Sequence, residues 1–274
     1  VAGGAALVVI DVGSKYDDVA VMAVFKDPAT GEPRLACASG GKVHIVDPVS
    51  GGEALLVMDA GDDVKALVVF EDPATGAPRL ACGCDDEKVR VFDPVAGGKA
   101  LVVLEVGGRV KALAVFTDPA TGELRLACGT GGYKCGDVRI YDPVAGGDAL
   151  LVLDIGSEVK ALAVFKEPAT GAPRLACGSD DGKVRVFDAV SGGDALLVRE
   201  DGRLGEGHVH ADRAVGARGA RDHRAAVAVQ QLVDGHLDGD ERRGARGVDD
   251  TVHAVEVEDI GAAPGGDIAQ KAWE

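Results

Sequence analysis

The sequence predicts an all-β fold in which a four-stranded antiparallel unit is repeated four times. The repeats span residues 19–61, 64–107, 110–156 and 159–201. Aligned on Cys37, Cys82, Cys128 and Cys177, they recur at intervals of 45, 46 and 49 residues. A nearly fixed period of this length indicates a repeat array, in which each unit buries its apolar faces against its neighbours.

Each repeat contains four short apolar runs bounded by turn residues, and none of them has a helical period. In the fourth repeat these runs are Lys160–Phe165, Arg174–Gly178, Val184–Phe187 and Ala195–Val198. The turns between them contain Pro168 and Gly171, the segment 179–182, and a Gly-Gly pair at 192–193,. Four strands joined by hairpins form a meander of the size of one β-propeller blade.

The first and third runs of a repeat differ in their patterns, and this difference predicts their places in the blade. The first run, such as Ala66–Phe70, is apolar throughout and must be covered on both faces,. This favours the innermost strand, which neighbouring blades enclose. The third run, such as Val89–Asp93, alternates apolar and polar residues. It is therefore expected farther out, with one face partly in water.

The segment Leu175–Asp188, LACGSDDGKVRVFD, resembles the core of a WD-repeat, which ends in an aromatic-Asp pair. The resemblance covers residues 1–201 and implies a β-propeller. Two features of the family pattern are missing: no Gly-His pair precedes the inner strand, and no Trp precedes the Asp. The resemblance therefore implies that the family's His-Asp-Ser-Trp network does not form here. The turn Asp of the pattern is matched by Asp86 and Asp181. The paired Asp is matched by Asp47, Asp93, Asp142 and Asp188, and the Trp position by Val46, Phe92, Tyr141 and Phe187.

The first residues of the chain match the end of a repeat. The segment 1–13, VAGGAALVVIDVG, aligns with 144–156, VAGGDALLVLDIG. We therefore expect Ala5–Asp11 to be an extra outer strand that belongs to a preceding blade, and the chain to be a piece of a larger propeller. A row of four blades also exposes apolar surface at its two ends. Unless the four blades close into a ring or further blades cover these ends, the chain is expected to self-associate through them.

The repeat pattern stops at Gly202, and the composition changes there. Residues 202–274 contain no Phe or Tyr and are rich in Arg, Gly, Asp and His. This composition predicts a disordered tail. A second interpretation is that the tail is not native protein, because a GC-rich gene read in a wrong frame yields the same residues. The segment Thr251–Asp259 alternates enough to add an edge strand, which is a third possibility.

Net charge limits the kinds of partner, and the placement of the cysteines indicates the cellular compartment. The formal net charge is −16, which disfavours nucleic acid and anionic membrane as partners and is compatible with basic protein surfaces. The charge also has a plainer explanation, solubility. Four of the six cysteines occupy one repeated strand position, where adjacent copies are too far apart for disulfides,. Reduced, buried thiols predict an intracellular protein, cytoplasmic or nuclear.

The chain carries no signature of catalysis. It lacks H-E-x-x-H, G-x-S-x-G and phosphate-loop motifs, and it has no C-x-x-C,. The turn Asp180-Asp181-Gly182 has too few ligands for calcium. An active site needs residues with different roles, whereas here the same residues recur in every repeat. We therefore predict a protein that is not an enzyme and has neither a cofactor nor a metal.

The candidate binding residues lie on one rim of the predicted blades. Lys65, Lys111 and Lys160 stand at the start of successive inner strands, and Asp86 and Asp181 lie in nearby turns. A lysine ring inside an acidic rim could hold an acidic side chain or C-terminus of a partner. In the alternative interpretation, the lysines reach water and are balanced by neighbouring aspartates. Tyr133 lies in a three-residue insertion of the third repeat, and insertions often map to binding faces,.

The sequence therefore predicts a non-enzymatic scaffold that binds proteins through its rim and channel mouth. The alternative is a catalytic or ligand-binding propeller whose site lies in blades outside this chain.

Overall fold

The computed structural model describes residues 6–12, 18–132 and 136–200, and these contain sixteen strands and no helix. The strands form four sheets, here called blades 1 to 4. Blade 1 contains β1 (Val19–Lys26), β2 (Pro33–Ser39), β3 (Lys42–Val46) and β4 (Leu56–Asp59). Blade 2 contains β5 (Val64–Glu71), β6 (Pro78–Cys84), β7 (Lys88–Phe92) and β8 (Val102–Glu105). Blade 3 contains β9 (Arg109–Thr117), β10 (Leu124–Gly131), β11 (Asp137–Tyr141) and β12 (Leu151–Asp154). Blade 4 contains β13 (Val159–Lys166), β14 (Pro173–Ser179), β15 (Lys183–Asp188) and β16 (Leu197–Glu200).

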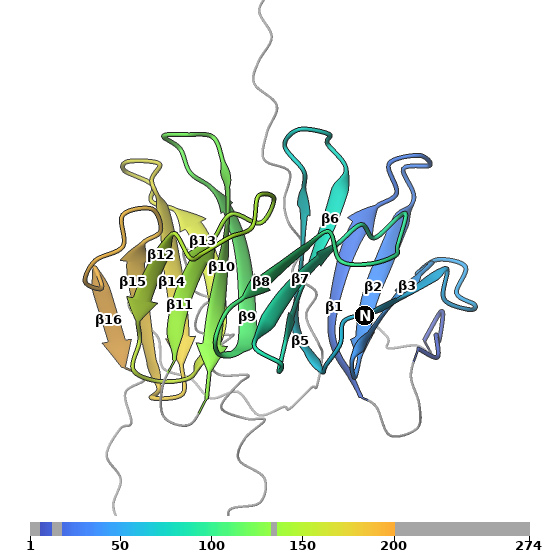
Figure 1. Cartoon of the computed structure of the whole chain (residues 1–274), viewed down its shortest axis with the longest axis horizontal. Coiled ribbons are helices and arrows are strands. Elements are labelled where there is room, and N and C mark those ends of the chain that lie inside the picture. Colours follow the sequence, from blue (N-terminus) through green and yellow to red (C-terminus); the bar gives the residue numbers. More distant parts are fainter. Residues whose placement is uncertain (1–5, 13–17, 133–135, 201–274) are drawn as a thin grey trace, which may run out of the picture.

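Every blade is an antiparallel meander in which the strands follow one another in sequence order. The blades stand side by side in a row, with blade 1 at one end and blade 4 at the other (Figure 1). Their first strands, β1, β5, β9 and β13, are neighbours across the row. These are the strands whose all-apolar pattern predicted an inner position, and the predicted blades are confirmed.

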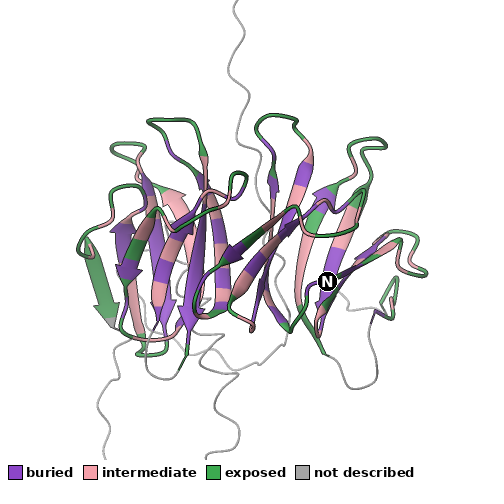
Figure 2. Cartoon of the chain, viewed as in Figure 1, coloured by how far each residue is buried: buried purple, intermediate pink, exposed green. Residues whose placement is uncertain are grey.

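The hydrophobic core lies between blades rather than within one blade. Side chains alternate along a strand, so Leu80 and Cys82 of β6 pack in a cluster with blade 1, whereas Ala81 packs in a cluster with blade 3,. A third cluster joins blades 3 and 4. Figure 2 shows buried residues along the strands and exposed ones in the hairpins. Each blade therefore presents one face to the blade that precedes it and one to the blade that follows.

In blades 2 and 3, close approach to the next blade leaves little room for a side chain at one position of the second strand, where blade 1 has the small residue Ala38. A Cβ added to Gly83 would lie 2.4 Å from Cγ1 of Val110, and one added to Gly129 would lie 2.5 Å from Cγ1 of Val159. These distances are too short for two carbon atoms. A valine at or next to the start of the next inner strand thus fills the space that a side chain would occupy.

Two expectations about outer strands are wrong in detail. The fourth run of the last repeat was expected at Ala195–Val198, but the ladder with β15 begins at Leu197. The extra outer strand expected at Ala5–Asp11 is not formed, because residues 6–12 carry no strand assignment. In every blade the fourth strand pairs with a third strand that precedes it in the sequence. No described residues provide that partner for residues 6–12.

The sequence predicts free thiols for all six cysteines. Five of them are described, and these are free and buried: Cys37, Cys82, Cys84, Cys128 and Cys177. Cys135 and the predicted tail, residues 202–274, lie outside the described residues, as do residues 1–5 and 13–17.

We predict that these thiols react with Ellman's reagent only after unfolding. Burial raises the pKa of Cys84 to about 11 and that of Cys177 to about 12, which leaves little reactive thiolate at pH 8,. Thiol titration in buffer and in denaturant measures the difference. Fast reaction of several thiols in the folded protein would contradict the packing described here.

Candidate functional site

Each blade has two ends, and the candidate residues gather at one of them. This end carries the turns between second and third strands and the connections into the next inner strand. We call it the acidic rim, defined by Asp62, Asp63, Asp85, Asp86, Glu87, Glu158, Asp180 and Asp181. The opposite end, the hairpin rim, carries the Pro-Ala-Thr-Gly turns at residues 28–31, 73–76, 119–122 and 168–171 and the Gly-Gly turns.

The three predicted lysines lie at the acidic rim, and each one is paired with a carboxylate. Lys111 Nζ of blade 3 lies 2.6 Å from Asp85 Oδ1 of blade 2. Lys65 Nζ lies 3.3 Å from Asp63 Oδ2 and 3.8 Å from Asp85 Oδ2. Lys160 Nζ lies 3.0 Å from Glu158 Oε1. Asp85 thus brings Lys65 and Lys111 together, and the lysines are balanced within the rim.

The predicted turn aspartates hold arginines of the third strand. Arg90 donates from both terminal nitrogens to Asp86, at 3.1 and 2.6 Å. Arg185 makes the same contact with Asp181, at 3.2 and 2.5 Å. Ser179 also donates its hydroxyl to Asp181, at 2.6 Å. A bidentate guanidinium–carboxylate pair combines charge with fixed geometry, so both aspartates anchor the turn to the sheet.

These arginines were missed by the sequence analysis, although their signal is present. An Arg recurs at the alternating third-strand position four residues after the turn Asp in blades 2 and 4. Blade 3 has a variant of the pair, in which Arg139 contacts Asp137 two residues earlier, at 2.8 Å. Blade 1 carries His44 at this position, opposite Cys37.

The insertion of blade 3 adjoins a cavity. Tyr133 lies outside the described residues, but the chain is described on both sides of it. Here Thr130 donates its hydroxyl to the Asp137 carboxylate, and Gly132 is exposed. An open cavity of about 420 Å³ lies beside Gly132, between blades 3 and 4. Its other lining residues are Ile155, Gly156, Ser157, Glu158, Asp180, Asp181 and Arg185.

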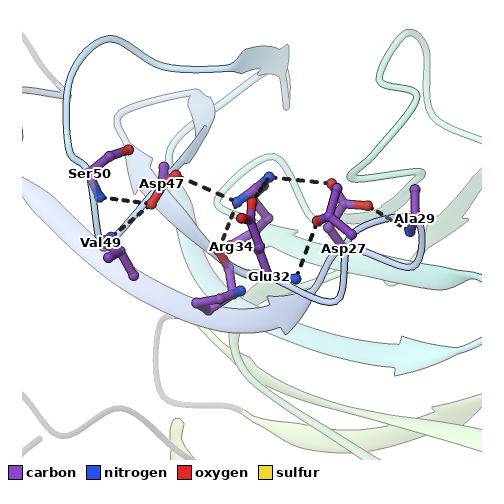
Figure 3. A network of polar contacts seen from close by, with 9 residues as sticks. Asp27, Ala29, Glu32, Arg34, Asp47, Val49 and Ser50 are labelled. Carbon is purple, nitrogen blue, oxygen red and sulfur yellow. Dashed lines mark hydrogen bonds and ion pairs between the residues drawn. The ribbon is translucent and has the colours of Figure 1, made fainter.

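The hairpin rim holds a second repeated network, which is drawn for blade 1 in Figure 3. Arg34 lies between Asp27, at 3.5 Å, and Asp47, at 3.7 Å, and it also contacts Glu32, at 3.1 Å. Asp47 accepts hydrogen bonds from the backbone N–H groups of Val49 and Ser50, at 2.8 and 3.0 Å. Asp93, Asp142 and Asp188 accept the same pair of bonds in their blades. The paired Asp of the WD-like pattern therefore fixes the last turn of each blade.

The comparisons with known proteins identify a fold. No protein-family model matches the chain, and no curated protein matches it. Sqt1 of Saccharomyces cerevisiae is similar in structure, with a TM-score of 0.52 and 16% identity over 66% of this chain and 49% of that one. The fold is that of a WD-repeat β-propeller.

Two further matches come from polycomb repressive complex 2. An active complex in the basal state gives a TM-score of 0.50 at 17% identity, covering 64% of this chain and 38% of that one. The complex from Chaetomium thermophilum bound to GSK126 gives 0.50 at 15% identity, covering 66% and 41%. The chain thus spans half or less of the length of these propellers.

The described residues contain no group of three or more side chains able to hold a metal ion. They also contain no helix long and apolar enough to cross a membrane.

The Arg185–Asp181 pair predicts a stability change at low pH. Partial burial acts to raise the pKa of Asp181, but the hydrogen bonds from Arg185, Ser179 and the Lys183 backbone N–H outweigh it and lower the pKa to about 2. A carboxyl whose folded pKa is depressed stabilises the fold above its unfolded pKa of about 4, and this contribution disappears as the pH falls towards 2.

We expect Asp181→Asn to lower the free energy of unfolding at pH 7 by about 1 kcal/mol, because the pair keeps contact with solvent. The difference from wild type should shrink between pH 4 and pH 2 in urea titrations. Asp194→Asn, in an exposed turn of the same blade, is the control. A difference that does not change with pH would contradict the assigned pKa.

Proposed function

We propose that this protein is a non-enzymatic scaffold whose acidic rim binds a basic segment of a partner protein. The observation that carries the proposal is the cavity between blades 3 and 4, because Asp180 lines it without an ion pair to any described residue, whereas Glu158 and Asp181 already face Lys160 and Arg185. Such a cleft suits a lysine or arginine side chain supplied from outside. The fold supports this use, since exposed loops on a rigid propeller can vary without disturbing the core.

The charges of the rim favour a basic partner over an acidic one. Among the described residues, the side chains of Glu87 and Asp180 make no ion pair, and both residues are exposed. Glu87 is held at the tip of its turn with a φ of 67°. The lysines, by contrast, already face carboxylates within the blades. A partner's acidic anchor would have to displace those contacts, whereas a basic side chain meets carboxylates that have no cation.

Lys65, Lys111, Lys160, Asp86 and Asp181 keep a role in this proposal as the frame of the rim. The lysines neutralise part of its charge. The two aspartates fix the turns that carry Glu87 and Asp180. We place the protein in an intracellular compartment, in accordance with its free thiols. No described observation favours the alternative of a catalytic or ligand-binding propeller.

The proposal predicts selective binding of cationic peptides. A fluorescent Arg-rich peptide should bind in anisotropy titrations and weaken as salt rises, and a Glu-rich peptide should not bind. Glu87→Lys with Asp180→Lys should weaken binding about tenfold, since each exposed contact is worth up to about 1 kcal/mol.

The matched control is Glu53→Lys with Glu71→Lys, which makes the same charge change at exposed positions of the hairpin rim. If both double variants weaken binding equally, the peptide senses only net charge and the rim is not the site. Binding of the Glu-rich peptide in its place, lost in Lys111→Ala, would transfer the proposal to an acidic anchor at the lysines.

A further inference from the structure

The two ends of the row of blades carry apolar clusters that lie on opposite faces of a blade. Inside the row, each blade packs its forward face against the backward face of the next blade. At the far end, the forward face of blade 4 forms a cluster of its own, made of Ala161, Ala163, Phe165, Ala176 and Val186. The matching phenylalanines of the other blades, Phe25, Phe70 and Phe116, are each 6% exposed, whereas Phe165 is only partly buried.

The opposite end is covered by residues 8–12, which lie as a preceding blade's outer strand would lie. Ile10 and Val12 pack on the backward face of blade 1, in one cluster with Cys37 and Val46. Val8 Cγ1 would lie 2.7 Å from a Cβ on Gly51. The outer strands β4 and β12 approach the following blade in the same way. A Cβ added to Gly97 would lie 2.6 Å from Leu56 Cδ1, and one added to Gly192 would lie 2.8 Å from Leu151 Cδ1.

Residues 8–12 are therefore seated as an outer strand that has no third strand beside it. A blade placed before blade 1 would need to supply only its first three strands, because the fourth position is occupied. The ends of the row are held apart (Figure 1), so blade 4 of the same chain does not reach this place.

The outer strand of blade 4, β16, is poorly suited to an apolar interface. In blades 1 to 3, the fourth strand places a large apolar residue opposite the first valine of the third strand. These residues are Met58, Leu104 and Leu153, and each is at most 4% exposed. In β16 this position is Arg199, opposite Val184, and it is exposed. In residues 8–12 the matching residue is Ile10, which is apolar like those of the inner blades.

We propose that a second copy of this chain docks at these ends. Blade 4 of one copy packs against blade 1 of the other, and residues 8–12 of that other copy replace β16 as the partner of β15. Ile10 then lies opposite Val184, and Asp11 lies opposite Lys183, as Glu105 lies opposite Lys88 in blade 2. Two such contacts join two chains into a closed ring of eight blades, within the range of about 4–8 found in propellers.

Sedimentation of the unaltered protein tests the association without any variant. We expect a mass of twice the 27.8 kDa of the chain. Phe165→Asp, on the forward face of blade 4, should convert the dimer to monomer. Val103→Asp is the control, because Val103 is 48% exposed on an outer strand in the middle of the row. A wild-type monomer would overturn the proposal and would mean that another segment, such as the tail, covers blade 4.

Cysteine pairing tests the strand exchange itself. Ile10→Cys with Val184→Cys should give a disulfide-linked dimer on a non-reducing denaturing gel after mild oxidation, since facing strand residues are within bridging range. The control is Ile10→Cys with Val138→Cys, because Val138 is already opposite Leu153. Equal cross-linking in both variants, or a disulfide within one chain, would overturn the proposal.

Discussion

Packing between neighbouring blades is the interaction on which this structure depends. The inner strands of a blade carry apolar residues on both faces of the sheet, and a sheet cannot cover its own faces. Burial therefore requires a blade on each side, as the clusters that join successive blades show. Repetition of the sequence follows from this requirement, because every blade must fit both a predecessor and a successor. The two ends of the row are the places where the requirement is unmet.

The same constraint restricts where function can reside. With both faces of a blade buried, polar groups are confined to the rims, the outer strands and the inner edge. The structure uses most of the rim charges to fix turns: Arg90 and Arg185 hold Asp86 and Asp181, and Asp85 joins two blades through Lys111. The carboxylates that remain without a cation, such as Glu87 and Asp180, are the groups to which we assign the proposed binding of a basic partner. The residues that fix the turns and the residues proposed to bind thus lie in the same repeated turns of the rim.

Sequence alone predicted the blades, because period, turn residues and apolar pattern all indicate the same meander. It also placed the candidate lysines on one rim, since residues at equivalent repeat positions must lie at equivalent places. It did not predict the pairing of Lys111 with Asp85, because that contact joins two blades and depends on how they pack. Nor did it predict that residues 8–12 would be seated without a ladder. Their apolar pattern specifies the face they cover, whereas a strand also requires a partner.

A double-mutant cycle on Gly83 and Val110 tests the central role of inter-blade packing most directly. Gly83→Ala should destabilise the protein, because the new methyl group would lie 2.4 Å from Val110 Cγ1. Val110→Ala should also destabilise it, by about 1–3 kcal/mol, because it leaves a cavity. We predict that the double variant, measured by urea unfolding, is more stable than the sum of the two losses allows, because the alanine methyl then occupies the vacated space. Additive losses would mean that the two blades do not pack at this contact and would contradict the account.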